Sequence, residues 1–135
     1  MAIDHIAIGV ANMDPAKSFC DAVLPPLGLL PIMPVRVFGA LAGMGFGDPA
    51  DGKPVFWAQL PINGRPASQG NGAHIAFAAK YRVAVDALYL AAMEQGAVED
   101  GKPGPRHEYH PNYDAAFIRD RDGHRIEAVC HAAED

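Results

Sequence analysis

Three side chains of this sequence have the types and spacing to bind one metal ion: His5, His74 and Glu127. Both histidines are followed by Ile-Ala and then an apolar residue, and such a repeat marks two copies of one structural unit. Glu127 interrupts the apolar run 125–131, where a buried carboxylate needs a partner. Two imidazoles and one carboxylate form a facial triad that leaves positions open on iron(II), manganese(II), nickel(II) or zinc(II).

Several plainer interpretations of the same residues exist. A strand histidine often only satisfies a local hydrogen bond, and Arg125 is a weak alternative partner for Glu127. His107 and His110 form an HxxH pair in a loop that offers a second metal-binding possibility. The glycines of 43–47 resemble a phosphate loop, but no helix follows them.

The composition limits the classes of function. A chain of 135 residues that is half apolar and one-fifth charged is typical of one globular domain. A net charge of −5 and an isoelectric point near 5.6 argue against nucleic acid as a partner. The sequence contains no membrane-spanning run and no signal-peptide pattern. Cys20 and Cys130 form no CxxC motif, so we expect buried free thiols and a cytoplasmic location.

Periodicity predicts the same series of elements twice. In the first half we expect a strand, a helix begun at Asn12 or Asp14, and three further strands. In the second half we expect a strand, a helix, and three strands, with a Gly- and Pro-rich connection before the last two. The predicted ranges are 3–10, 15–23, 28–37, 41–46 and 55–60, then 73–79, 82–95, 97–99, 115–119 and 125–131, with the connection at 101–112. The fold class is therefore α+β, with two βαβββ modules at 1–60 and 73–135 and a linker at 61–72.

Three stretches together resemble the vicinal oxygen chelate superfamily. The stretches are DHIA at 4–7, GAHIAF at 72–77 and FIRDRDGHRIE at 117–127. The superfamily includes lactoylglutathione lyase (glyoxalase), methylmalonyl-CoA epimerase, extradiol dioxygenases, and the bleomycin- and fosfomycin-resistance proteins. The resemblance implies paired βαβββ modules whose sheets curve around a divalent metal. It also implies that the metal ligands are His5, His74 and Glu127.

The sequence departs from the lyases at the position of their fourth ligand, a glutamate in the last strand of module one. Aligning the Asp-Gly turns places Phe56 opposite Glu127, and a shift of one residue places Trp57 there. Neither side chain binds a metal, and the nearest polar group is Gln59. A three-ligand site is closer to that of the extradiol dioxygenases.

Further candidates lie around the predicted metal. His110 and Tyr113, at the end of the Gly- and Pro-rich connection, are the candidate proton carriers. Arg106 is a candidate partner for a substrate carboxylate or phosphate. Trp57 and Phe46 are candidates for lining an aromatic or apolar pocket. We expect His124 and His131 to be surface groups.

These residues predict a small metal-dependent enzyme that binds neighbouring oxygens of a small substrate: a lyase, an isomerase or a ring-cleaving dioxygenase. The alternative is a metal-free binding protein of the bleomycin-resistance type, and a third possibility is a domain without activity. The resemblance also implies a homodimer whose modules pair within one chain or are exchanged between two. If they are exchanged, His5 shares its metal with His74 and Glu127 of the other chain.

Overall fold

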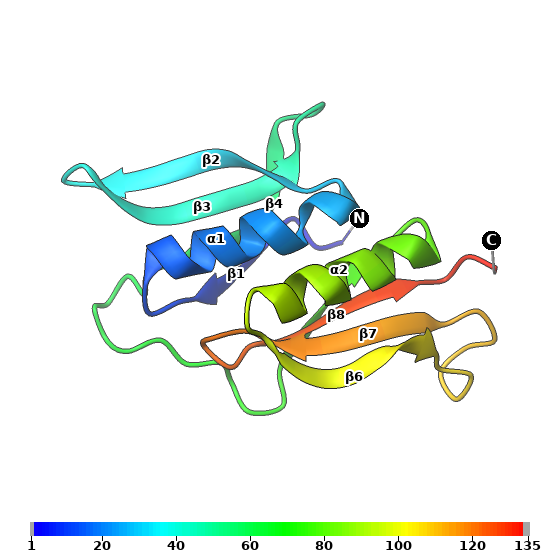
Figure 1. The fold of residues 1–135 in the computed structure, drawn as a ribbon. Helices are drawn as coiled ribbons and strands as arrows, with labels where there is room; N and C mark the ends of the chain where they lie inside the picture. Colours follow the sequence, from blue (N-terminus) through cyan, green and yellow to red (C-terminus); the bar gives the residue numbers. More distant parts are fainter. Residues whose placement is uncertain (1, 134–135) are drawn as a thin grey trace.

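The computed structural model describes residues 2–133, which form two four-stranded sheets and two α-helices (Figure 1). The first sheet has the order β1-β4-β3-β2, and its strands are β1 (Ile6–Gly9), β2 (Leu30–Val37), β3 (Ala40–Asp48) and β4 (Lys53–Gln59). The second has the order β5-β8-β7-β6, and its strands are β5 (His74–Ala78), β6 (Val98–Pro105), β7 (Asp114–Arg119) and β8 (Arg125–Cys130).

The two sheets have the same topology. In each, the first strand of the module pairs in parallel with the last, and the other pairs are antiparallel. A helix connects the first strand of each module to the three that follow. The predicted α+β fold of two βαβββ modules is confirmed, and the sheets do not close into a barrel.

The helices are α1 (Met13–Val23) and α2 (Arg82–Glu94). Helix α1 starts two residues before the predicted position, with Asn12 as its N-cap residue but without a capping side-chain hydrogen bond. It is followed by a 3₁₀ turn, η1 (Pro25–Leu27), and then by Gly28. Gly28 and Gly96 follow the helical segments at φ of 78° and 84°, left-handed values that glycine adopts without a steric penalty.

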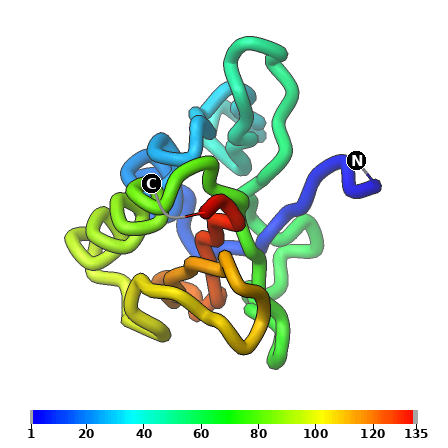
Figure 2. Tube along the Cα trace, turned by 90° about the vertical axis from the view of Figure 1, so that its right-hand side faces the viewer, coloured from blue at the N-terminus to red at the C-terminus, as the bar shows by residue number. Residues whose placement is uncertain are grey.

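One hydrophobic core joins the two modules. The inner faces of both sheets pack against the helices, and α1 and α2 contact each other. The ring centroids of Phe56 on β4 and Phe77 on β5 lie 5.1 Å apart in an edge-to-face arrangement, so the modules share aromatic packing. Figure 2 shows the helices gathered on one side of the molecule and the N-terminal segment extending on the other.

Strand β6 differs from its prediction. A strand is present where 97–99 was expected, but pairing with β7 extends it through Pro105, so the first part of the connection expected at 101–112 is strand. The register shifts twice along this pair, around Gly101 and before Gly104. Such irregularities and prolines are tolerated at the edge of a sheet, where one side of the strand has no ladder to complete. The sequence pattern missed residues 100–105 of β6, because pairing with β7, and not local strand propensity, determines their conformation.

The linker between the modules and the two cysteines complete the description of the fold. The linker 61–72 contains neither helix nor strand. Cys20 and Cys130 are both free and buried. No helix in the described part of the chain has the length and apolar character required to cross a bilayer.

Candidate functional site

Both predicted histidine ligands lie on sheet faces turned away from the helices. Ile8 on β1 and Phe77 on β5 are buried in the shared core. Because side chains alternate along a strand, Ala7 and Ala76 point to the opposite, outer face, and so does His74 at the start of β5. His5 precedes β1 and lines a hollow together with Ala7.

On the second sheet, His74 and Glu127 are brought together. Strand pairing sets Ala76 beside Glu127, and Nε2 of His74 lies 3.3 Å from Oε1 of Glu127. The glutamate side chain is 2% exposed, whereas the His74 side chain is 42% exposed. The hydroxyl of Tyr113 donates a short hydrogen bond to Oε2 of Glu127. Both carboxylate oxygens therefore have partners, which compensates for the burial of the group.

Tyr113 is held in its protonated form by this arrangement. Burial raises the pKa of Tyr113 to about 12, and the hydrogen bond to Glu127 and the charge of that carboxylate act in the same direction. The phenol therefore keeps its proton at neutral pH and serves as a hydrogen-bond donor.

His5 directly precedes β1 of the first sheet and has a different environment. Its Nδ1 is 2.6 Å from Oδ1 of Asp4, whose other oxygen is 2.8 Å from Nζ of Lys53. The hydrogen bond from His5 and then the ammonium of Lys53 lower the pKa of Asp4. Nowhere within residues 2–133 do three His, Cys, Asp or Glu side chains gather so as to hold a metal ion. One chain thus joins two of the three predicted ligands, and the role of His5 stays a prediction.

The strand register identifies the residue in the place of the fourth ligand. Ala7 pairs with Trp57 just as Ala76 pairs with Glu127, so Trp57 is the counterpart of Glu127. Phe56, the other candidate, is 2% exposed and belongs to the core.

Trp57 lines a hollow on the outer face of the first sheet. The hollow has a volume of about 410 Å³, and His5, Gln59 and Lys53 contribute polar groups to it. The indole rests on Gly45 of the neighbouring strand, where an added Cβ would lie 2.9 Å from the ring. Glycine at this position therefore makes room for the Trp57 ring.

Two predicted substrate-binding residues, Phe46 and Arg106, contact other parts of the protein, and a substrate-binding role for Arg106 stays a prediction. Phe46 has no exposed surface and packs near Phe56 in the core, so the prediction that it lines a pocket with Trp57 is wrong. Side chains alternate between the two faces of a strand, and the glycines of β3 gave no sequence signal for which of its faces points to the core. Arg106 donates hydrogen bonds to the carbonyls of Gly104 and Lys102, and these bonds stabilise the end of β6.

His110 lies near Tyr113 without contacting Glu127. Its Nδ1 accepts a hydrogen bond of 3.1 Å from the backbone N–H of Asn112. Its ring packs edge-on against His131 at 5.8 Å, and His131 packs against Tyr113 at 5.1 Å. A role for His110 as a proton carrier stays a prediction.

His124 is buried, contrary to the expectation of a surface group. It is 6% exposed, and its Nε2 lies 2.6 Å from the carbonyl oxygen of Gly9 on β1. It therefore links the β7–β8 turn to module one. The sequence carries no signal for this contact, because the two residues lie far apart along the chain.

Comparisons with known proteins identify relatives of this fold. A model of the Glyoxalase/Bleomycin resistance protein/Dioxygenase superfamily matches residues 35–128. A crystal structure of a glyoxalase/bleomycin resistance protein from Albidiferax ferrireducens T118 is 30% identical, with a TM-score of 0.80. The match covers 96% of this chain and 98% of that chain. No curated protein matches significantly.

More distant solved structures share the fold. The fosfomycin resistance protein FosX from Listeria monocytogenes is 15% identical with a TM-score of 0.63, over 96% of this chain and 93% of that chain. An E144Q glyoxalase I mutant from Zea mays is 19% identical with a TM-score of 0.67, over 94% of this chain and 46% of that one.

Proposed function

The chain belongs to the Glyoxalase/Bleomycin resistance protein/Dioxygenase superfamily, and we propose on this premise that it is a small metal-dependent enzyme. Its substrate is a small molecule with two neighbouring oxygens, and its reaction is that of a lyase, an isomerase or a ring-cleaving dioxygenase. The ligands of the divalent metal are His5, His74 and Glu127.

The pairing of His74 with Glu127 carries this proposal. An imidazole and a nearly fully buried carboxylate face each other across two parallel strands at 3.3 Å. Imidazole nitrogen and carboxylate oxygen are ligands shared by iron, manganese, nickel and zinc, so the donor set fits the group. Tyr113 binds the second carboxylate oxygen, and such an outer hydrogen bond orients a ligand.

A second copy of the chain completes the ligand set in this proposal. Within one chain His5 is paired with Asp4 on the other sheet, and only two of the three ligands meet. The outer faces that carry His5 and His74 are available to another molecule, and a two-fold dimer would bring each face against its counterpart. We therefore propose a homodimer in which His5 of one copy joins His74 and Glu127 of the other.

The chain's own groups divide the work around such a centre. A bound metal would supply Lewis acidity to substrate oxygens and stabilise the negative charge that develops there. Glu127 is fixed by Tyr113, which limits its rotation, while the exposed side of His74 leaves access for a ligand. Trp57 provides an apolar surface in the hollow beside His5. His110 is the candidate for moving a proton to or from substrate, because imidazole is a common proton carrier in enzymes.

Metal titration tests the proposal. Chelator-treated protein is titrated with Mn²⁺, Ni²⁺, Zn²⁺ and, without oxygen, Fe²⁺, alongside His74→Ala and the loop variant His107→Ala as a matched control. The proposal predicts about one ion per chain for the wild type and for His107→Ala, and none for His74→Ala. If none of the four ions binds the wild type, the metal-dependent enzyme is ruled out.

The second candidate function is a metal-free binding protein. Trp57 favours it, because an indole stands where a symmetric site would have a second carboxylate. In that case the hollow beside Trp57 holds a small apolar or aromatic ligand by itself. Quenching of the single tryptophan by a ligand in metal-free protein would support this function over the enzyme.

A further inference from the structure

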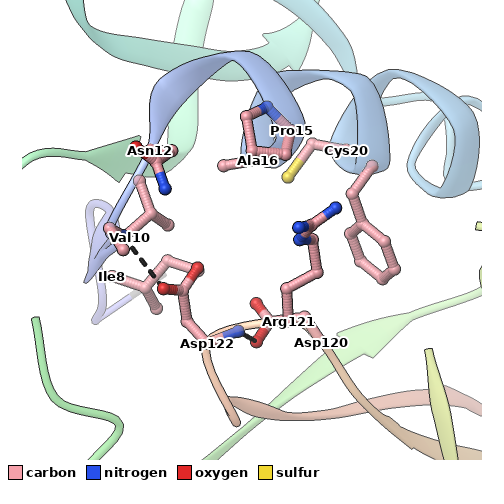
Figure 3. Close-up of a pocket in the computed structure, with 11 residues that line it drawn as sticks. Ile8, Val10, Asn12, Pro15, Ala16, Cys20, Asp120, Arg121 and Asp122 are labelled. Atoms are coloured by element: carbon pink, nitrogen blue, oxygen red, sulfur yellow. Dashed lines mark hydrogen bonds between the residues drawn. The ribbon is translucent and has the colours of Figure 1, made fainter. Parts of the chain in front are cut away.

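A second cavity lies on the opposite side of β1 from His5. It is enclosed by β1, the start of α1 and the turn between β7 and β8, and has a volume of about 170 Å³ (Figure 3). Its apolar walls are formed by Ile8, Val10, Ala16 and Phe19. For comparison, an apolar cavity of about 150 Å³ takes up benzene. This cavity therefore has room for one ring or a branched alkyl group.

Cys20 contributes a further apolar surface. Its side chain is directed into the cavity from α1, and the residue is 5% exposed (Figure 3). Burial raises the pKa of the thiol to about 12, so it is a neutral thiol at physiological pH. Among the described residues the sulfur has no hydrogen-bond partner, and a ligand in the cavity would lie against it.

The turn between β7 and β8 supplies the polar part of the cavity. Oδ1 of Asp120 accepts the backbone N–H groups of Asp122 and His124, at 3.0 and 2.8 Å. Asp120 is half-buried, so its Oδ2 stays open to solvent or to a ligand. Burial raises the pKa of Asp120, and the backbone hydrogen bond from His124 acts in the opposite direction. A cationic donor on a ligand would favour the charged form of this carboxyl group.

The charge at this end of the cavity is negative. Asp120 and Asp122 both line it, and so does Arg121, whose guanidinium extends from the turn toward Cys20 (Figure 3). Oδ1 of Asp122 accepts the backbone N–H of Ala11 at 2.9 Å, so this carboxylate also ties module two to module one. Two carboxylates against one exposed guanidinium favour a cationic ligand group over an anionic one.

We propose that this cavity binds a small primary amine whose apolar body is about the size of a benzene ring. The ammonium group donates to Asp120 and Asp122, and the apolar body lies among Ile8, Phe19 and Cys20. The site is separate from the proposed metal centre, because Ile8 lines this cavity, whereas His5 lines the hollow beside Ala7 and Trp57 on the other face of β1. The amine-binding proposal can be tested independently of the metal-dependent function.

Three benzene-sized probes test the proposal on the full chain: benzylamine, toluene and phenylacetate. Binding is followed by backbone amide shifts in two-dimensional NMR at pH 7. We expect saturable shifts with benzylamine at Ala11, Phe19 and Asp122. Toluene, which lacks the donor, and phenylacetate, which carries the wrong charge, should bind at least about tenfold more weakly.

Matched variants locate the interaction. Asp120→Asn keeps an oxygen for the two backbone N–H groups but removes the charge, and should weaken benzylamine binding about tenfold. Asp48→Asn is the control, because Asp48 accepts a backbone N–H in the equivalent turn of module one, on the exposed surface. Ala16→Phe fills the cavity and should abolish binding. If that variant does not fold, Ala16→Val provides a smaller filling that should still reduce affinity.

Each opposite result overturns the proposal. Equal binding of toluene and benzylamine would make the cavity a purely apolar site, and tighter binding of phenylacetate would make it an anion site. Benzylamine binding that is unchanged in Asp120→Asn, or shifts confined to residues outside the cavity, would also contradict it.

Discussion

The two modules place different chemistry on the same framework. On the second sheet, the outer-face position beside Ala76 is Glu127, which is bonded to His74 and Tyr113. On the first sheet, the equivalent position beside Ala7 is Trp57, which rests on Gly45. The repeat thus fixes where each side chain points, whereas the residue type decides whether the position offers a carboxylate or an apolar surface.

The residue that pairs with Trp57 or Glu127 on the adjacent strand also differs between the two sheets. Gly45 pairs with Trp57, and Phe117 occupies the matching place beside Glu127. The aromatic ring is on one strand in module one and on the adjacent strand in module two. Phe117 lies under the guanidinium of Arg125 at 4.3 Å, a cation–π contact for which Trp57 has no counterpart among the described residues. Each sheet keeps one large ring on its outer face.

The largest expected effect is the loss of metal affinity on removing the charge of Glu127, the acidic residue of the second sheet. Glu127→Gln should lower metal affinity by more than about 100-fold, because a ligand is lost rather than an outer hydrogen bond. Glu99→Gln is the control, since Glu99 is also a strand glutamate bonded to a tyrosine hydroxyl, that of Tyr89. Isothermal titration with Mn²⁺ or Zn²⁺ measures both. Equal metal affinities of Glu127→Gln and Glu99→Gln would show that Glu127 is not a metal ligand.

Restoring symmetry should strengthen metal binding. Trp57→Glu creates the counterpart of Glu127, and a fourth ligand should raise affinity about 10- to 100-fold if both sheets face one metal. Trp57→Phe serves as the control, because it removes the indole without adding a ligand. Competition with a chelator of known affinity measures the change. No gain in the glutamate variant would mean that the two positions do not meet at one ion.

A smaller effect should follow from adding one methyl group under the indole. In Gly45→Ala the new Cβ would lie 2.8 Å from Pro54 and 2.9 Å from the Trp57 ring, and such overpacking costs about 1–3 kcal/mol. Gly104→Ala, on the other sheet, would meet Arg106 only at an ordinary 3.5 Å and should be tolerated. Urea unfolding compares the two variants, and equal stabilities would contradict the close packing of Trp57 on Gly45.

The smallest effect concerns the hydroxyl of Tyr113. Tyr113→Phe should lower the free energy of unfolding by about 1 kcal/mol at pH 7, the net worth of a hydrogen bond. The folded pKa of Tyr113, about 12, is above the ordinary value of 10. The wild type should therefore lose stability more steeply than the variant as pH rises from 10 to 12. Parallel pH dependences would show that Tyr113 does not donate to Glu127.

Local patterns in the sequence were sufficient to predict the fold. The repeated His-Ile-Ala motif, the glycines after both helices and the Asp-Gly turns reflect short-range constraints, and they gave the two modules. The extension of β6 over residues 100–105 was not predicted, because pairing with β7 determines it. Its glycines and prolines indicate a loop when considered alone.

The site was predicted less completely than the fold. The meeting of His74 with Glu127 was predicted from a histidine repeated in two equivalent strands and from a carboxylate set in an apolar strand. Whether Phe56 or Trp57 faces outward depended on a one-residue register that turn alignment leaves open. The positions of Phe46, Arg106 and His124 depend on packing between segments distant in sequence, which periodicity does not report.

Mixing two defective variants tests the central claim, a metal site shared between two copies of the chain. His5→Ala and Glu127→Ala should each bind no metal alone. After joint refolding, about a quarter of the sites should bind Mn²⁺ or Zn²⁺, since half of the dimers are then mixed and each mixed dimer has one intact site. A mixture that binds no metal, while wild-type protein treated in the same way does, would show that the site is not shared between chains.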